Sequence, residues 1–280
     1  MSLLSDFVWK PKYDSDDRNL LGEFYEPALA CAIRYDRTTG YFSSGVLTLS
    51  SRGIEGLVRN GGRMRLVVGC TLGPDDVEAI TRGESLRNTV EARLMRQPLV
   101  PADAPESAAL ALLSWMVAQG MLEVKVAIPC DTKRRPVAGN VVFHEKAGIV
   151  EDKTGDRLAF NGSINETPQG WAGNWESFHV FASWSGDDAR RRVEVEEEGF
   201  GQLWNDKKKQ CIVIDVPQAV RDDLLRFLPL EGVVPSWLGP PSSEAPPPRK
   251  GEISAVPPPP PEPKKAEARP LGFRTVSFQR

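Results

Sequence analysis

The chain has 280 residues, 40% of them hydrophobic, and its 38 acidic and 35 basic side chains give a formal net charge of −3. This composition supports a sizeable buried core, and its mild acidity excludes a protein that coats nucleic acid indiscriminately, because such binding depends on Lys and Arg neutralising phosphates. Neither a basic, apolar leader nor a run of membrane-spanning length is present, so we expect a cytoplasmic protein with no membrane partner.

The first third of the chain alternates between helical and extended patterns. Apolar spacing predicts a helix over residues 19–34, with a break or kink at Pro27. Residues 37–45 are predicted to form a strand that ends in a turn of small residues, residues 46–58 a helix, and residues 64–70 a compact strand. This strand–helix–strand order suggests a βαβ unit.

The alternation continues to about residue 227. We expect further helices over residues 75–96, 105–120, 187–204 and 218–227. We expect further strands over residues 122–128, 141–144, 157–160 and 212–214, and in the apolar run at 175–181. Helices that alternate with short strands predict an α/β fold, an α/β/α sandwich with a mixed β-sheet.

Proline content separates the C-terminal part from the rest. Thirteen of the 24 prolines lie at or after Pro235. Such a region is extended and has little core of its own. We therefore expect an N-terminal segment at 1–17, a folded domain at 18–230, and a Pro-rich linker or disordered tail at 231–280.

Two short motifs suggest catalysis. On a strand, residues i and i+2 project from one face, so His144 and Lys146 place a titratable nucleophile and a fixed cation at one point. Ser163 and Asn165 follow one strand later, where they either face a reacting group or cap a turn, and the two roles can coexist. Glu176 lies in an apolar run, where a carboxylate is costly without a partner.

This pattern resembles the phospholipase D superfamily, whose signature reads His-x-Lys, four residues, an acid, a variable stretch, and Gly-Ser-x-Asn. Glu151 stands where the family usually has Asp. The stretch before Gly162 is a few residues longer than the usual form, and a predicted hairpin turn at 153–156 would absorb the excess. The resemblance implies a phospholipase D-like catalytic domain over roughly residues 18–230, with a single motif copy per chain.

The resemblance also implies roles for individual residues. It makes His144, Lys146, Ser163 and Asn165 catalytic, and in small nucleases of the superfamily a glutamate placed like Glu176 holds the catalytic histidine. The mechanism uses two histidines, whereas the chain has one motif copy. It therefore implies a homodimer with a composite site, in which one imidazole attacks phosphorus and the other protonates the leaving oxygen.

Few other residues suggest ligand contacts. The remaining histidine, His179, is expected on the opposite face of its strand from Glu176 and is interpreted as structural. Trp171 is a candidate for stacking on a nucleobase, and Tyr41 for lining the cleft, although a core position is the favoured alternative for Tyr41. The motif has no accompanying ligand cluster, so we expect no metal and no other cofactor.

The leading hypothesis is a metal-independent phosphodiesterase or endonuclease that acts on nucleic acid, DNA ahead of RNA, in a bacterial defence system. The alternative is a catalytically silent dimerising module that binds nucleic acid or docks a helicase or ATPase partner through the Pro-rich tail. Cleavage that resists a chelator and disappears in His144→Ala favours the first, and tight binding without cleavage favours the second.

Overall fold

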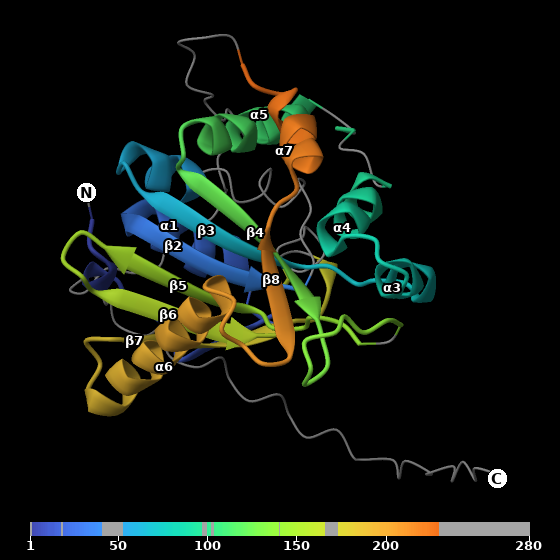
Figure 1. Cartoon of the computed structure of the whole chain (residues 1–280). Helices are drawn as coiled ribbons and strands as arrows, with labels where there is room; N and C mark the ends of the chain where they lie inside the picture. The colour runs from blue at the N-terminus through green and yellow to red at the C-terminus, as the bar shows by residue number, and fades with distance from the viewer. Residues whose placement is uncertain are drawn as a thin grey trace, which may run out of the picture.

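The structure is a computed structural model that describes residues 2–17, 19–40, 53–96, 100–101, 104–139, 141–165 and 173–229. Its centre is one eight-stranded sheet with the order β1-β7-β6-β5-β2-β3-β4-β8 (Figure 1). The strands are β1 Lys12–Asp14, β2 Ala32–Thr39, β3 Arg63–Gly69, β4 Leu122–Pro129, β5 Ala147–Asp152, β6 Arg157–Gly162, β7 Ser177–Ala182 and β8 Cys211–Asp215.

Strand direction determines which chain segments meet. Strands β2, β3 and β4 run parallel, whereas β5 is antiparallel to β2, and β6, β7 and β8 are each antiparallel to their neighbour. As a result the C-terminal ends of β2, β3, β4 and β6 and the N-terminal ends of β5, β7 and β8 lie at one edge. We call it the active edge.

The helices cover both faces of the sheet. They are η1 Leu4–Asp6, the π-helical η2 Leu21–Tyr25, α1 Glu26–Cys31, α3 Pro74–Thr81, α4 Leu86–Met95, α5 Ala104–Ala118, α6 Asp187–Trp204 and α7 Gln218–Leu225, with a further helical segment at 53–59. In the part of the chain that the structure describes, no helix combines the length and apolar character needed to cross a membrane.

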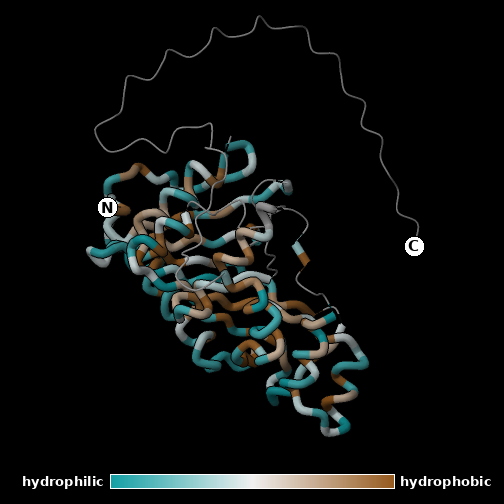
Figure 2. The backbone as a smooth tube through the Cα atoms, turned by 90° about the horizontal axis from the view of Figure 1, so that it is seen from above, coloured by the Kyte–Doolittle hydropathy of each residue, from teal (hydrophilic) through white to brown (hydrophobic). Residues whose placement is uncertain are grey.

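The apolar residues of the central strands alternate between the two faces of the sheet. In β6, Leu158 and Phe160 pack with α1 and α5 on one face, and Ala159 packs with α6 on the other. Figure 1 shows α6 lying across β6 and β7, and Figure 2 shows brown, hydrophobic stretches of the backbone tube in the middle of the fold. The predicted α/β sandwich with a mixed sheet is therefore confirmed.

The α6 face of the sheet also carries paired charges. Arg65 donates two hydrogen bonds to the buried Asp36, at 2.7 and 2.6 Å, and Arg34 pairs with Glu151 at 2.6 Å and with Glu197 of α6. A buried carboxylate is tolerated only with such partners. These ion pairs help to hold α6 against the strands.

Four predicted elements differ from the structure. The helix predicted at 19–34 ends at Cys31, and β2 begins at Ala32, five residues earlier than expected, because its pairing with β3 and β5 buries it centrally. Pro27 lies in the first turn of α1, where its missing N–H is tolerated, and the chain changes from the π-helical η2 to α1 directly before it. The helix predicted at 75–96 divides into α3 and α4 around Gly83, whose φ is +108°.

The strand predicted at 141–144 is absent: residues 141–146 have no regular secondary structure, and β5 starts at Ala147. The predicted elements at 157–160, 187–204 and 212–214 match β6, α6 and β8 closely. Most of the helix expected at 46–58 lies outside the described residues.

The N-terminal segment belongs to the sheet. Strand β1 pairs antiparallel with β7, and Leu4 and Tyr13 are buried in the core shared with α1. The backbone N–H of Leu4 donates to the buried Asp152 at 2.8 Å. Residues Leu4 and Tyr13 thus pack in the same core as α1, while the tail expected at 231–280 lies outside the described residues.

We predict that Phe24→Ala lowers the free energy of unfolding by about 3–5 kcal/mol, the usual cost of removing a buried aromatic ring. Phe24 is fully buried, and its ring centroid lies 4.9 Å from that of Phe178 and 5.1 Å from that of Phe160. Urea denaturation measures the change. Val195→Ala on α6, where the side chain is 61% exposed, is the control and should change stability by about 0.5 kcal/mol or less. Equal effects would contradict this account of the core.

Candidate active site

Four sequence segments meet at the active edge. Gly40 follows β2, Lys146 precedes β5, Asn165 follows β6 and Glu176 precedes β7. The antiparallel pairing of β5 with β2 and with β6 brings the two motifs together. The predicted catalytic residues Lys146 and Asn165 therefore lie side by side.

Lys146 is buried although it carries a charge. The residue is 4% exposed, and its Nζ donates a hydrogen bond to the backbone carbonyl of His144 at 3.2 Å. The next residue, Ala147, is fixed by Thr38, whose Oγ1 accepts from the Ala147 N–H at 3.0 Å. The ammonium group is therefore held by β2 and β5 beneath the backbone of the predicted nucleophile.

Gly40 leaves the space that Lys146 and Asn165 share. A Cβ at this position would lie 3.4 Å from Lys146 Nζ, 3.4 Å from Asn165 Oδ1 and 2.9 Å from the carbonyl oxygen of Phe143. Thr39 Oγ1 donates to Asn165 Oδ1 at 3.4 Å and so orients the amide. The cation and the amide face one small space above Gly40.

Two buried charges act on Lys146. Removal from water lowers the pKa of its ammonium group, the negative charge of Glu176 opposes this shift, and the positive charge of Arg37 adds to it. Glu176 is 6% exposed, and its Oε1 accepts from Asn174 Nδ2 at 3.2 Å. The charges of the buried residues Glu176 and Arg37 thus act in opposite directions on the buried ammonium group.

Arg37 is a residue that the sequence analysis missed. Its side chain is fully buried on β2, where the guanidinium lies 5.1 Å from the Phe160 ring and donates to the carbonyl of Ile164 at 2.6 Å. That bond anchors the residue before Asn165. Extending the alternation of the strand from the buried Tyr35 would have placed Arg37 on the same face.

His144 is exposed, in contrast to Lys146. The sequence argument placed both side chains on one face of a strand, and it fails because the segment is not a strand. They are instead linked by the hydrogen bond from Lys146 Nζ to the His144 carbonyl. Within the described part of the chain, the imidazole forms no hydrogen bond, so the prediction that Glu176 holds it stays a prediction.

The remaining predicted residues have other surroundings. Ser163 Oγ accepts from the Ser177 N–H at 3.1 Å, which joins the ends of β6 and β7, while a contact with substrate stays a prediction. Glu151 pairs with Arg34 on the α6 face, away from Lys146. His179 is exposed between the buried Phe178 and Val180, and so it also lies on the α6 face.

Tyr41 and Trp171, the predicted substrate contacts, lie outside the described residues. Among the residues that are described, no group of three or more His, Cys, Asp or Glu side chains could hold a metal ion. The site offers a buried ammonium group and a fixed amide, and the residue whose carbonyl binds the ammonium group carries an exposed imidazole. Such an arrangement suits attack on an anionic group whose oxygens need preorganised donors.

Comparison with known proteins gives no family assignment. No protein-family model matches the chain, and no curated protein matches it. Similar solved structures include NucT from Helicobacter pylori, with 12% identity over 72% of this chain and 97% of that chain, at a TM-score of 0.39. Phosphatidylserine synthase from Haemophilus influenzae Rd KW20 has 19% identity over 72% of this chain and 41% of its own, at a TM-score of 0.36. TM-scores below 0.5 do not establish a common fold.

We predict that Gly40→Ala lowers the free energy of unfolding by about 1–3 kcal/mol, because the added methyl group would overlap the backbone carbonyl of Phe143. Gly201→Ala in α6 is the matched control. No atom lies within 4 Å of a Cβ at that position, so the substitution should be neutral or raise stability by up to about 1 kcal/mol. Urea denaturation compares the two variants. If Gly40→Ala were as stable as Gly201→Ala, the tight packing above Gly40 would be refuted.

The Lys146 ammonium group should titrate below the ordinary lysine pKa of 10.5, as followed by NMR of its side chain. Glu176→Gln removes the neighbouring negative charge and should lower the pKa of Lys146 further, whereas Arg37→Met should raise it. The unfolded chain keeps the Lys146 proton up to a higher pH than the folded chain does. The free energy of unfolding should therefore rise with pH between the folded-state and unfolded-state pKa values of Lys146. A Lys146 pKa that is identical in both variants and in the parent protein would contradict the proposed electrostatics.

Proposed function

We propose that the protein is a phospholipase D-like phosphodiesterase that cleaves nucleic acid through a phosphohistidine intermediate in a homodimeric composite site. The observation that supports this proposal is the arrangement of three residues. The His144 imidazole is exposed, and the His144 backbone carbonyl accepts a hydrogen bond from the buried Lys146. Lys146 and Asn165 in turn face the same small space. The two sequence motifs, distant along the chain, supply these groups together. DNA is proposed ahead of RNA as the substrate.

The chemistry begins with attack of the His144 imidazole on phosphorus. A P–N bond forms as the bond to the leaving oxygen breaks, and His144 of the partner subunit protonates that oxygen. The same second imidazole then removes a proton from water, which attacks phosphorus and releases the first imidazole. No step of this scheme uses a metal.

Lys146 and Asn165 stabilise the charge that develops during both steps. The ammonium group is held in place before substrate arrives, and the hydrogen bond from Thr39 to Asn165 Oδ1 leaves Nδ2 as the amide donor. Donors that need no reorganisation stabilise an oxyanion effectively in a site that excludes water. The 4% exposure of Lys146 places it where such an interaction is strong.

A second subunit is proposed because one chain offers one suitable imidazole. The chain contains two histidines, and His179 lies on the α6 face, opposite the face on which Lys146 packs. A two-fold axis near His144 would bring the same residue of another copy to the reacting phosphate. A bacterial defence setting and a helicase or ATPase partner rest on the superfamily resemblance alone.

We predict cleavage of single- or double-stranded DNA or RNA by the purified full chain in excess chelator. His144→Ala should abolish cleavage, whereas His179→Ala, which changes the other histidine, should retain it. Gel analysis of labelled substrates measures both. Tight binding without cleavage by the unaltered chain would instead support a silent docking module.

Mixed subunits test the composite site. When unfolded wild-type and His144→Ala chains are refolded together in equal amounts, random pairing leaves about a quarter of the dimers with two intact imidazoles. Cleavage should fall to about that fraction of the unmixed rate. A fall to only about half would place a complete site in each chain and reject the shared mechanism.

A further inference from the structure

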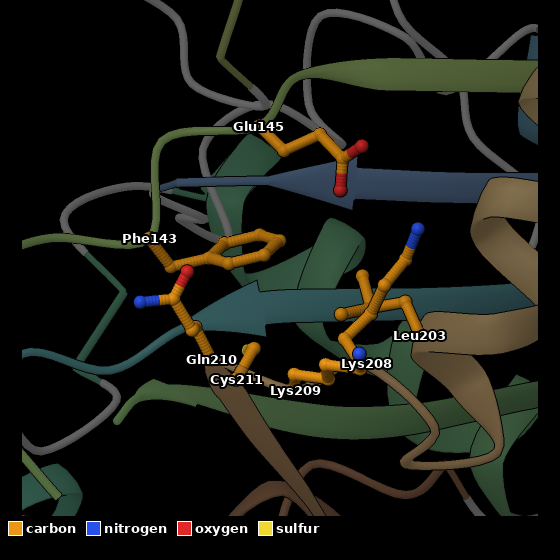
Figure 3. A pocket seen from close by; sticks show the side chains of 7 residues that line it. All are labelled: Phe143, Glu145, Leu203, Lys208, Lys209, Gln210 and Cys211. Carbon is orange, nitrogen blue, oxygen red and sulfur yellow. The ribbon is translucent and has the colours of Figure 1, made fainter. Parts of the chain in front are cut away.

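A second concave feature lies at the active edge, on the α6 side of the segment that carries His144. It is a cavity of about 350 Å³ lined by residues that include Phe143, Glu145, Lys208, Lys209 and Gln210. Figure 3 shows Phe143 and Glu145 along one side of it and Lys208, Lys209 and Gln210 along the other. We call it the lysine recess.

The lysine recess and the site at Lys146 share one wall. Phe143 and Glu145 are the two sequence neighbours of His144, and both line the recess, while Lys146 packs beneath the same segment. A Cβ at Gly69, the last residue of β3, would lie 3.1 Å from Phe143 Cβ, so the ring is placed directly above the strand end. A ligand in the recess therefore lies beside the backbone segment that carries His144.

Hydrogen bonds hold the backbone of the loop that carries Lys208 and Lys209. Arg134 donates to both carboxylate oxygens of Asp206 at 2.6 Å and to the carbonyl of Lys208 at 2.7 Å. Asp206 also accepts from the Val213 N–H at 2.8 Å, and the Cys130 N–H donates to the carbonyl of Gln210 at 3.0 Å. The backbone of residues 206–210 is thus tied to β4 and β8, which makes the recess a preorganised feature.

The charges of the recess favour an anion. Lys208 and Lys209 form no ion pair with any residue that the structure describes, in contrast to Arg134, which Asp206 neutralises. Glu145 is an exposed residue, yet its carboxyl group is surrounded closely enough that desolvation raises its pKa, which Lys208 opposes and Glu196 reinforces. Two lysines and one carboxyl group whose charged form is penalised by desolvation thus line the recess.

We propose that the lysine recess binds a backbone phosphate of the nucleic-acid strand beside the scissile phosphate, with Lys208 and Lys209 as the cations. This rests on the proposed function, which supplies the strand. Phe143 gives the recess an apolar wall for the adjoining sugar or base, and the Gln210 amide adds a neutral hydrogen-bonding group. The protein would then contact the scissile phosphate and a neighbouring phosphate of the same strand. A polynucleotide should therefore bind more tightly than a small phosphodiester, which has only one phosphate.

The test measures binding, so it does not require cleavage. A fluorescent single-stranded DNA oligonucleotide is titrated with His144→Ala protein and with the same protein carrying Lys208→Ala and Lys209→Ala, and anisotropy is recorded at several salt concentrations. Each phosphate contact by a cation contributes about 0.7 to the slope of log K against log salt for single strands. We expect binding about tenfold weaker at low salt and a slope smaller by about 0.7, because the recess binds one phosphate.

The matched control removes two other lysines, Lys207 and Lys153. Lys207 adjoins the recess in sequence without lining it, and Lys153 lies in the turn between β5 and β6 at the far end of the strands. An equal loss of affinity and slope in this control would overturn the proposal, since net charge alone would explain both. So would a mononucleotide that binds as tightly as the oligonucleotide, which would identify a small-molecule site.

Failure of the proposed function has a separate signature. If the wild-type chain binds the oligonucleotide through the lysine recess but cleaves no nucleic acid, the recess stands and the catalytic proposal falls. If it cleaves a chromogenic phosphodiester in chelator and the recess variants bind the oligonucleotide as the parent does, the catalytic proposal stands and the recess falls.

Discussion

Burial of the Lys146 ammonium group is the constraint on which the candidate site depends. A charged amine that is 4% exposed must be surrounded by groups that compensate for lost hydration. The His144 carbonyl accepts a hydrogen bond from it, and the carboxylate of Glu176 supplies a negative charge nearby. Gly40 keeps the space beside the ammonium group open. An ammonium group held in this way can stabilise an oxyanion without moving, because the protein has already ordered it during folding.

The mixed direction of the sheet makes this arrangement possible. The parallel strands β2, β3 and β4 end where the antiparallel strands β5, β7 and β8 begin, so chain segments from residue 40 to residue 211 converge on one edge. Charge is also divided between the faces. The α6 face carries the ion pairs of Asp36 with Arg65 and of Arg34 with Glu151, whereas Arg37 and Lys146 pack on the opposite face. The lysine recess adds Lys208 and Lys209 at the same edge.

Local patterns in the sequence predicted the α/β class, most helices and the approximate positions of most strands. They also identified Lys146 and Asn165 as candidate site residues, because the two motifs lie at the ends of neighbouring strands. What they missed depends on contacts far along the chain. The start of β2 at Ala32 follows from its pairing with β3 and β5, and the burial of Arg37 follows from its bond to Ile164, 127 residues away. The irregular backbone at 141–146 and the hydrogen bond from Lys146 Nζ to the His144 carbonyl are likewise features that no alternation pattern encodes.

The most direct test of the account is to trap the covalent intermediate. The full chain is mixed with a DNA oligonucleotide in excess chelator, quenched within the first turnover under alkaline denaturing conditions that preserve phosphohistidine, digested, and analysed by mass spectrometry. The account predicts a phosphate-linked nucleotide adduct on the peptide that contains His144, attached to that imidazole. Turnover with the adduct on another residue, or with none at any quench time, would contradict it.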